Sequence, residues 1–123
     1  MILVDTSIWI DHLRQGNEHL AHLLGEGQVV THPYVIGELA LGSLQNRIVV
    51  LEGLKNLAHA VVATDDEVLR FIENNAVFGR GIGYIDAHLL AAVRLTAGSK
   101  LWTRDKRLLS VSTDLGLAYP YSH

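Results

Sequence analysis

Short apolar stretches alternate with longer amphipathic stretches along almost the whole chain, and this alternation restricts the fold more than any other feature. Between the short stretches, apolar side chains recur at the spacing of a helix. Strands that alternate with helices form a mostly parallel sheet with helices on both faces. We therefore predict an α/β fold with four to five strands. The strand candidates are residues 2–4, 28–31, 60–64 and 100–103, with 118–121 as a further edge strand.

Capping residues predict where several helices begin. Thr6 or Ser7 is the expected N-cap of the first helix, and Asn17 is expected to cap the second. Pro33 stands where a first helical residue is expected. Residues 47–57, RIVVLEGLKNL, contain β-branched side chains that favour a strand locally, but their apolar spacing favours a helix.

The composition excludes several classes of protein. A chain of 123 residues with 49% hydrophobic and 19% charged residues fits one compact domain, residues 1–123. The absence of cysteine excludes a disulfide framework and a thiolate zinc site, and it suits a cytoplasmic location. We expect no signal peptide and no membrane span. The formal charge of −3 argues against a generally basic surface for nucleic acids, although a local basic patch remains open.

Four acidic residues either follow an apolar strand or interrupt an apolar helix. Asp5 follows the first predicted strand, and Asp105 follows the strand predicted at residues 100–103. Sites in parallel sheets form at the carboxyl ends of the strands, so these two acids are expected at one edge. Glu38 and Asp86 lie on helices that are otherwise apolar. Each acid taken singly is explained as a cap or a boundary charge, but together the four converge on one edge of a parallel sheet.

Four carboxylates in one pocket repel one another strongly. At a separation of ~5 Å and an effective dielectric constant of ~20, each pair costs on the order of 3 kcal/mol. The pocket must therefore bind protons or a hard cation. Ligation by oxygen alone favours magnesium or manganese. We predict a metal site at this edge of the sheet.

Four motifs resemble those of PIN-domain ribonucleases, and of the VapC toxins of bacterial and archaeal toxin–antitoxin pairs in particular. The motifs are ILVDTSIWID, GELALG, YIDAHLLAAV and LWTRDKRL, in this order over nearly the whole chain. The resemblance implies a single PIN-like domain. It also implies that an acidic quartet is both catalytic and metal-binding. By this resemblance the quartet is Asp5, Glu38, Asp86 and Asp105.

The resemblance further implies the reaction and the partners. The expected activity is endonucleolytic hydrolysis of RNA by water activated with Mg²⁺ or Mn²⁺, leaving a 3′-hydroxyl end. The expected partners are the RNA substrate and a cognate antitoxin that covers the acidic pocket. A homodimer is also expected, with the apolar segment 47–57 at its interface.

Hydroxyl side chains beside the acids are expected to support the site. Thr103 matches a hydroxyl position that supports the site in this family, and Thr6 and Ser7 match the opening motif. Tyr34 is a candidate for stacking on a base. The glycine-rich loop 78–84, FGRGIGY, has no counterpart in the family pattern.

Basic residues next to the predicted site are candidates for RNA contact. Arg104, Lys106 and Arg107 surround Asp105 in sequence and would position RNA through its phosphates. Arg80 and Arg94 are further candidates for the rim of the site. The alternative is that these cations form a solvated helix start.

Two other functions remain open. One is a different Mg²⁺-dependent phosphohydrolase, but a haloacid-type phosphatase requires Asp-x-Asp after the first strand, and position 7 is Ser7. A receiver domain requires an acidic pair before its first helix, which this chain lacks. The other is a catalytically silent PIN-like module that binds RNA or protein. The intact acidic quartet argues against that second alternative.

Overall fold

The computed structural model describes residues 1–121, and four parallel strands form its central sheet. The strands are β1 (Ile2–Val4), β2 (Val29–Thr31), β3 (Ala58–His59) and β4 (Lys100–Trp102). Their spatial order is β3-β2-β1-β4, so the N-terminal strand lies inside the sheet. The prediction of an α/β fold around a parallel sheet is confirmed.

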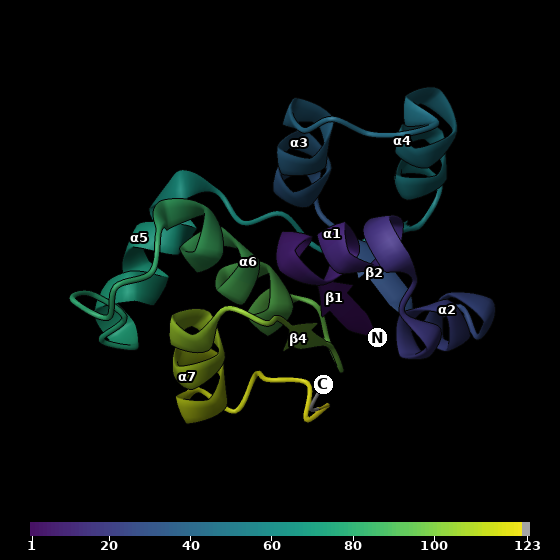
Figure 1. Ribbon diagram of the computed structural model, residues 1–123. Helices are drawn as coiled ribbons and strands as arrows, with labels where there is room; N and C mark the ends of the chain where they lie inside the picture. The colour runs from purple at the N-terminus through teal and green to yellow at the C-terminus, as the bar shows by residue number, and fades with distance from the viewer. Residues whose placement is uncertain (122–123) are drawn as a thin grey trace.

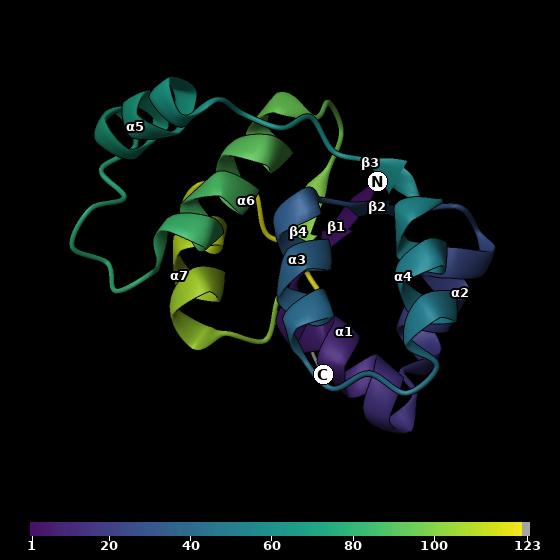
Figure 2. The same ribbon diagram turned by 90° about the horizontal axis from the view of Figure 1, so that it is seen from above.

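Helices surround this short sheet in two groups (Figures 1 and 2). Helices α5 to α7 gather on the side of β4, and α1 to α4 gather on the side of β1 and β2. None of the helices within residues 1–121 is long and apolar enough to cross a membrane. The helices are α1 (Thr6–Gln15), α2 (Glu18–Gly25), α3 (Pro33–Leu41), α4 (Arg47–Lys55), α5 (Asp65–Asn74), α6 (Tyr84–Leu95) and α7 (Lys106–Asp114).

The two strands that carry the site are buried at their carboxyl ends. Leu3, Val4 and Leu101 have no exposed surface, and Trp102 is 1% exposed. A strand of a parallel sheet that is covered on both faces is expected to be apolar throughout. Burial of these side chains therefore fixes the positions of the carboxyl ends of β1 and β4.

The register of β1 and β4 aligns the residues that follow them. Val4 pairs with Trp102, and the Asp5 N–H donates to the Trp102 carbonyl over 2.9 Å. Because the two strands are parallel, both chains leave the sheet at the same edge. This places Asp5 beside Thr103.

The third strand was predicted at residues 60–64, and this prediction is wrong. β3 pairs with β2 only through Ala58 and His59. The Val61 N–H then donates over 2.9 Å to the hydroxyl of Thr96, the residue that follows α6, so the chain has left the sheet. Val61 is 49% exposed.

The edge strand predicted at residues 118–121 is reduced to one parallel bridge between Ala118 and Leu101. Leu101 donates to the Leu117 carbonyl and accepts from the Tyr119 N–H, each over 2.8 Å. The next residue is Pro120, which has no N–H to extend the pairing.

Two of the three helix starts that the sequence addresses are confirmed. The Asn17 side chain accepts from the Leu20 N–H over 2.9 Å, and Pro33 is the first residue of α3. Residues 47–55 form helix α4 rather than a strand. Neither Thr6 nor Ser7 is the N-cap of α1, because Asp5 holds that position. The two hydroxyls are used elsewhere in the site.

Candidate metal centre

Asp5 is buried, and its carboxylate orientation is set by two hydroxyl groups. Thr103 Oγ1 and Ser7 Oγ each donate to Asp5 Oδ2 over 2.8 Å. Both hydroxyls are themselves held in place. The Asp105 N–H donates to Thr103 Oγ1 over 3.0 Å, and the Arg104 N–H donates to Ser7 Oγ over 3.1 Å. The start of α1 and the segment after β4 therefore form one network around Asp5.

Glu38 and Asp86 are each fixed through one oxygen. On α3, Glu38 Oε1 accepts from the Thr6 hydroxyl over 2.9 Å. On α6, Asp86 Oδ2 accepts from the Gly83 N–H over 3.3 Å, as an acid in the first turn of a helix commonly does. Glu38 is exposed and Asp86 is half-buried, so both can be reached from solvent, whereas Asp5 is buried.

Asp105 completes the set at the start of α7. Its Oδ1 accepts from the Leu108 N–H over 2.9 Å and caps the helix. In each of the four acids, one carboxylate oxygen thus accepts a hydrogen bond from the protein. The other oxygen accepts none within residues 1–121. Each side chain is oriented, yet it keeps one oxygen available for a ligand.

The electrostatics of Asp86 show that the four acids influence one another. Burial is the largest cause that raises the pKa of Asp86, and the charges of the other three carboxylates raise it further. The hydrogen bond from Gly83 acts in the opposite direction and is too weak to cancel these effects. The negative charges of the site therefore repel one another, and a bound cation would relieve this repulsion.

The donor set fits a hard divalent cation. All four candidate ligands supply carboxylate oxygen, the ligand type that Mg²⁺ and Mn²⁺ prefer. Within the described part of the chain, no three acidic or histidine side chains converge closely enough to hold a metal ion in their present positions.

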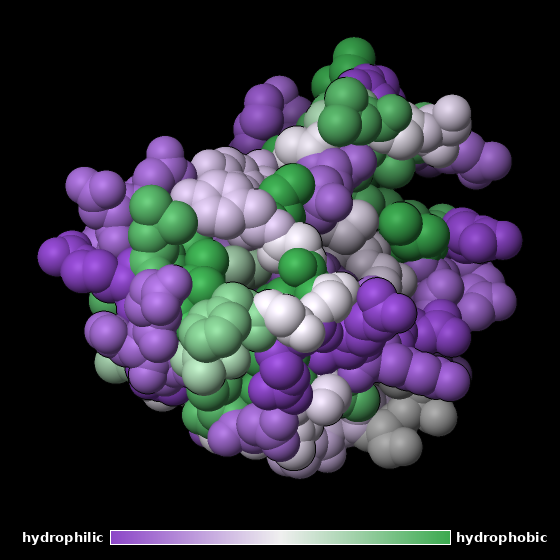
Figure 3. Space-filling view, turned by 90° about the vertical axis from the view of Figure 1, so that its left-hand side faces the viewer, coloured by the Kyte–Doolittle hydropathy of each residue, from purple (hydrophilic) through white to green (hydrophobic). Residues whose placement is uncertain are grey.

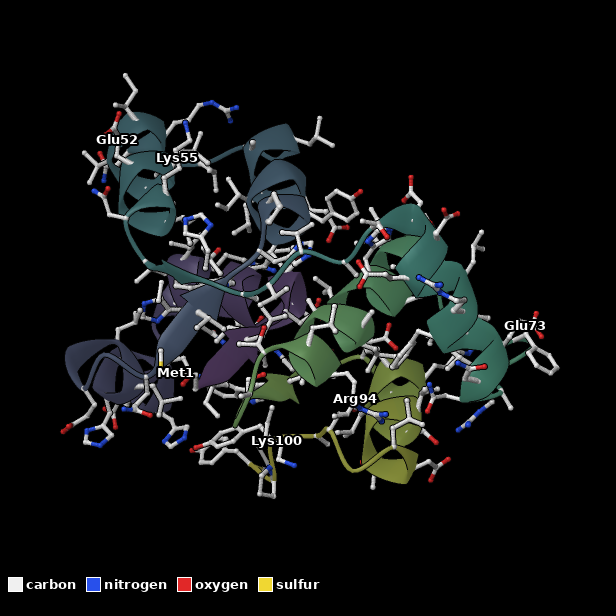
Figure 4. The ribbon with its side chains drawn as sticks, turned by 180° about the vertical axis from the view of Figure 1, so that it is seen from behind. Met1, Glu52, Lys55, Glu73, Arg94 and Lys100 are labelled. Carbon is white, nitrogen blue, oxygen red and sulfur yellow. The ribbon has the colours of Figure 1, made fainter. Side chains whose placement is uncertain are left out.

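The predicted RNA-binding cations have different surroundings. Arg104 forms an ion pair with Asp11 of α1, so its charge is already engaged. The Lys106 side chain is exposed and makes no ion pair within residues 1–121. Arg94, labelled in Figure 4, is eight residues beyond Asp86 on α6, about 12 Å along the helix axis. It lies over Phe71, and the expectation that Arg94 flanks the site is wrong.

The glycine-rich loop is attached to α7. Arg80 forms a 2.8 Å ion pair with Asp114. A Cβ added at Gly81, whose φ is +80°, would lie 3.0 Å from two atoms of the Arg107 side chain. Arg107 therefore covers the loop backbone at Gly81, and the ion pair of Arg80 ties the loop to the end of α7. The loop leads directly to Gly83, whose N–H orients Asp86.

Sequence reasoning missed Asp11 and a cluster around His88. His88 is 1% exposed, and its Nε2 lies 3.2 Å from Asp65 Oδ1. The Tyr84 hydroxyl donates to the same oxygen over 3.0 Å. The four-residue spacing of Tyr84 and His88 on one helix was the available signal.

Comparison with known proteins identifies the family. The model of the PIN domain family matches residues 2–113. Two proteins named Ribonuclease VapC32, from two strains of Mycobacterium tuberculosis, are each 52% identical to this chain over 118 residues. The match covers 96% of this chain and 95% of each relative. The chain belongs to the VapC ribonucleases of the PIN-domain family. The family resemblance predicted from the four motifs is thereby confirmed.

Solved structures support the same PIN-domain fold. FitAcB from Neisseria gonorrhoeae superposes with a TM-score of 0.64 at 21% identity, covering 92% of this chain and 94% of that chain. The structure of FitAB bound to an IR36 DNA fragment also gives a TM-score of 0.64, at 17% identity, with 100% and 99% coverage. At this level of identity the likeness concerns the fold.

Proposed function

We propose that this VapC-family PIN domain is the endoribonuclease toxin of a toxin–antitoxin pair, and that it cleaves RNA in the cytoplasm at its acidic quartet. One observation carries the assignment to this site. Each of the four carboxylates has one oxygen fixed by the protein and one oxygen available. This is the arrangement expected of metal ligands whose orientation is set in advance by outer hydrogen bonds.

PIN-domain ribonucleases in general depend on a divalent metal. In this chain, the open oxygens of the quartet would hold Mg²⁺ or Mn²⁺. The metal would polarise the phosphodiester, favour deprotonation of the attacking water and stabilise the leaving oxygen. The residues of the quartet are Asp5, Glu38, Asp86 and Asp105.

The surrounding residues keep this site in shape before the substrate arrives. Thr103 and Ser7 hold Asp5 through a single oxygen, so its carboxylate cannot turn freely. Thr6 does the same for Glu38 across the gap between α1 and α3. Ligands held in place by packing and by hydrogen bonds lose little freedom when they bind.

A cleavage assay tests this function. The purified protein is incubated with end-labelled single-stranded RNA in Mg²⁺, and in EDTA as the control. We expect internal cleavage in Mg²⁺ only, with 3′-hydroxyl ends, because water attack expels the 3′ oxygen. RNA binding without cleavage would favour the silent module instead. Release of phosphate from a monoester, with the RNA chain intact, would favour a different phosphohydrolase.

We assign two protein partners to helices α3 and α4, which together are called the α3–α4 arm. A groove of about 610 Å³ lies between α1, α3 and α4 and includes Glu38 in its lining. We assign the groove and the adjoining acidic quartet to the antitoxin, with an Arg or Lys of the antitoxin pairing with the quartet.

Apolar side chains gather at the outer end of the α3–α4 arm, as the top of Figure 3 shows. Leu41 is 90% exposed and Ile48 76% exposed, and we assign this surface to the homodimer, which light scattering would test.

Lys106 is the strongest candidate for a phosphate contact in the basic segment, because Arg104 is paired with Asp11 and Arg107 covers Gly81. The change Lys106→Glu is expected to weaken binding to all RNA sequences alike. Each lost phosphate contact should reduce the salt slope of the affinity by about 0.7 for single-stranded RNA. Fluorescence anisotropy at several salt concentrations measures both effects.

The matched control for that experiment is Lys100→Glu, which makes the same charge change at the start of β4, the end of the strand opposite to the site (Figure 4). It should leave the salt slope unchanged. If Lys106→Glu shifted the cleavage position at unchanged affinity, Lys106 would be reading bases rather than holding phosphate.

A further inference from the structure

Two exposed tyrosine rings belong to the two helices that carry Glu38 and Asp86. Tyr34 is 37% exposed and lies on α3, four residues before Glu38 and so on the same face of the helix. Tyr84 is 47% exposed and begins α6, in the same turn as Asp86. The rings therefore extend from the two helices that also carry quartet residues.

Both rings pack edge-on against the same buried histidine. The ring centroid of His88 is 4.8 Å from that of Tyr34, with an angle of 63°, and 4.7 Å from that of Tyr84, with an angle of 89°. Asp65, whose side chain is 76% exposed, holds this arrangement by accepting from the Tyr84 hydroxyl and by pairing with His88. Because the rings are already held, little side-chain conformational entropy is lost when a ligand stacks on them.

The two tryptophans of the chain have no such exposure. Trp9 is 5% exposed and Trp102 is 1% exposed, so both belong to the core. The charged side chains near the site also offer little positive charge to bind phosphate. Arg104 is paired with Asp11, and the quartet is itself negative. A chain with a formal charge of −3 therefore needs a contribution to RNA binding that does not depend on charge.

We propose that Tyr34 and Tyr84 form a stacking platform for an unpaired base of the RNA next to the cleavage site. Aromatic side chains stack on bases with little dependence on sequence, and only bases outside a duplex are available for this. The substrate class is accordingly single-stranded RNA or the loop of a folded RNA. This inference rests on the proposed ribonuclease function, since it takes RNA as the ligand.

Binding in EDTA tests the platform without cleavage. The probe is a short single-stranded RNA that contains 2-aminopurine, whose fluorescence falls when it stacks, and the same strand annealed to its complement serves as the duplex probe. Tyr34→Ala and Tyr84→Ala are each expected to weaken single-strand binding by at least about fivefold and to reduce the quenching. Duplex binding should not change. Tyr34→Phe and Tyr84→Phe keep the rings and should bind the single strand within about twofold of the wild type.

The control is Phe78→Ala, which removes a ring that is 62% exposed on the loop after α5 and should have no effect. Thermal melts of all variants establish that they are folded. The platform is overturned if the Ala variants bind the single strand like the wild type, or if the Phe variants lose as much as the Ala variants. It is also overturned if Phe78→Ala has the same effect, or if the wild type does not bind the probe. The proposed function fails separately, if the wild type binds RNA but does not cleave it in Mg²⁺.

Discussion

Asp86→Asn is expected to reduce RNA cleavage by roughly 10²–10³-fold or more, because it removes a charged metal ligand and with it transition-state stabilisation. The substitution keeps the shape of the side chain. The amide oxygen can still accept from the Gly83 N–H, so the first turn of α6 is preserved. Asp5→Asn should have a comparable effect on cleavage. Initial rates on end-labelled RNA in saturating Mg²⁺ measure both losses.

Glu73→Gln is the matched control for these variants. Glu73 is an exposed acid at the outer end of α5, away from the sheet (Figure 4). Its neutralisation should leave the cleavage rate within about twofold of the wild type, as is usual for a surface position without partners. Wild-type rates in the Asp86→Asn and Asp5→Asn variants would remove these acids from the proposed mechanism.

The same Asp86→Asn variant is expected to be more stable than the wild type in EDTA at neutral pH. Because the native pKa of Asp86 is raised, the native state binds more protons than the unfolded chain just above the ordinary value of 3.8. The free energy of unfolding therefore falls as the pH rises through this window. Removing the charge should restore on the order of 1 kcal/mol once solvent screening is allowed for.

Magnesium should stabilise the wild type by binding to its native state, and it should barely shift the Asp86→Asn variant. Thermal melts of both proteins, with EDTA and with Mg²⁺, compare these effects. If the variant melted well below the wild type in EDTA and Mg²⁺ raised both equally, Asp86 would be a structural cap rather than a ligand.

Features that act over three or four residues were predictable from the sequence. Asn17 caps α2 through a residue three positions away, and Pro33 begins α3 because its ring already has a helical φ. The neighbourhood of the acids was also predictable, since parallel strands bring their carboxyl ends to one edge. Asp5 and Asp105 follow the adjacent strands β1 and β4 for this reason.

Features that depend on distant partners were not predictable. The third strand was misplaced because the Val61 N–H bonds to the hydroxyl of Thr96, the residue after α6, which is 35 residues away in sequence. Arg104 seemed available for RNA because its partner, Asp11, lies near the other end of the chain. Local sequence cannot show that such a charge is already paired, since the pairing follows from the register of β1 and β4.

Acid is expected to destabilise the protein through His32, whose ring is fully buried. His32 precedes α3, and its Nδ1 accepts from the Tyr34 N–H over 3.0 Å, which caps the helix that carries Glu38. A nitrogen that accepts a hydrogen bond carries no proton. Burial, reinforced by the neighbouring His88 and His59, lowers the pKa of His32 from 6.5 to about 4.

The sign of the effect follows from where each state takes up the proton. The unfolded chain protonates His32 near pH 6.5, whereas the native state does so only near pH 4. Between these values the unfolded state binds more protons, so the free energy of unfolding decreases as the pH falls. The stabilisation is complete above pH 6.5 and is lost by about pH 4. The total change is about 3 kcal/mol.

His32→Asn isolates this contribution, because the Asn side chain can cap α3 by accepting from the Tyr34 N–H but does not titrate. Denaturant unfolding in EDTA, from above pH 6.5 down to about pH 4, compares the two proteins. We expect the wild type to lose about 3 kcal/mol more than the variant over this range, whatever their difference at neutral pH. The opposite titration of Asp86 occurs in both proteins and cancels in the comparison. Equal pH slopes would mean that His32 does not hold its cap as a neutral ring, and the acid sensitivity of α3 would then have to come from another group.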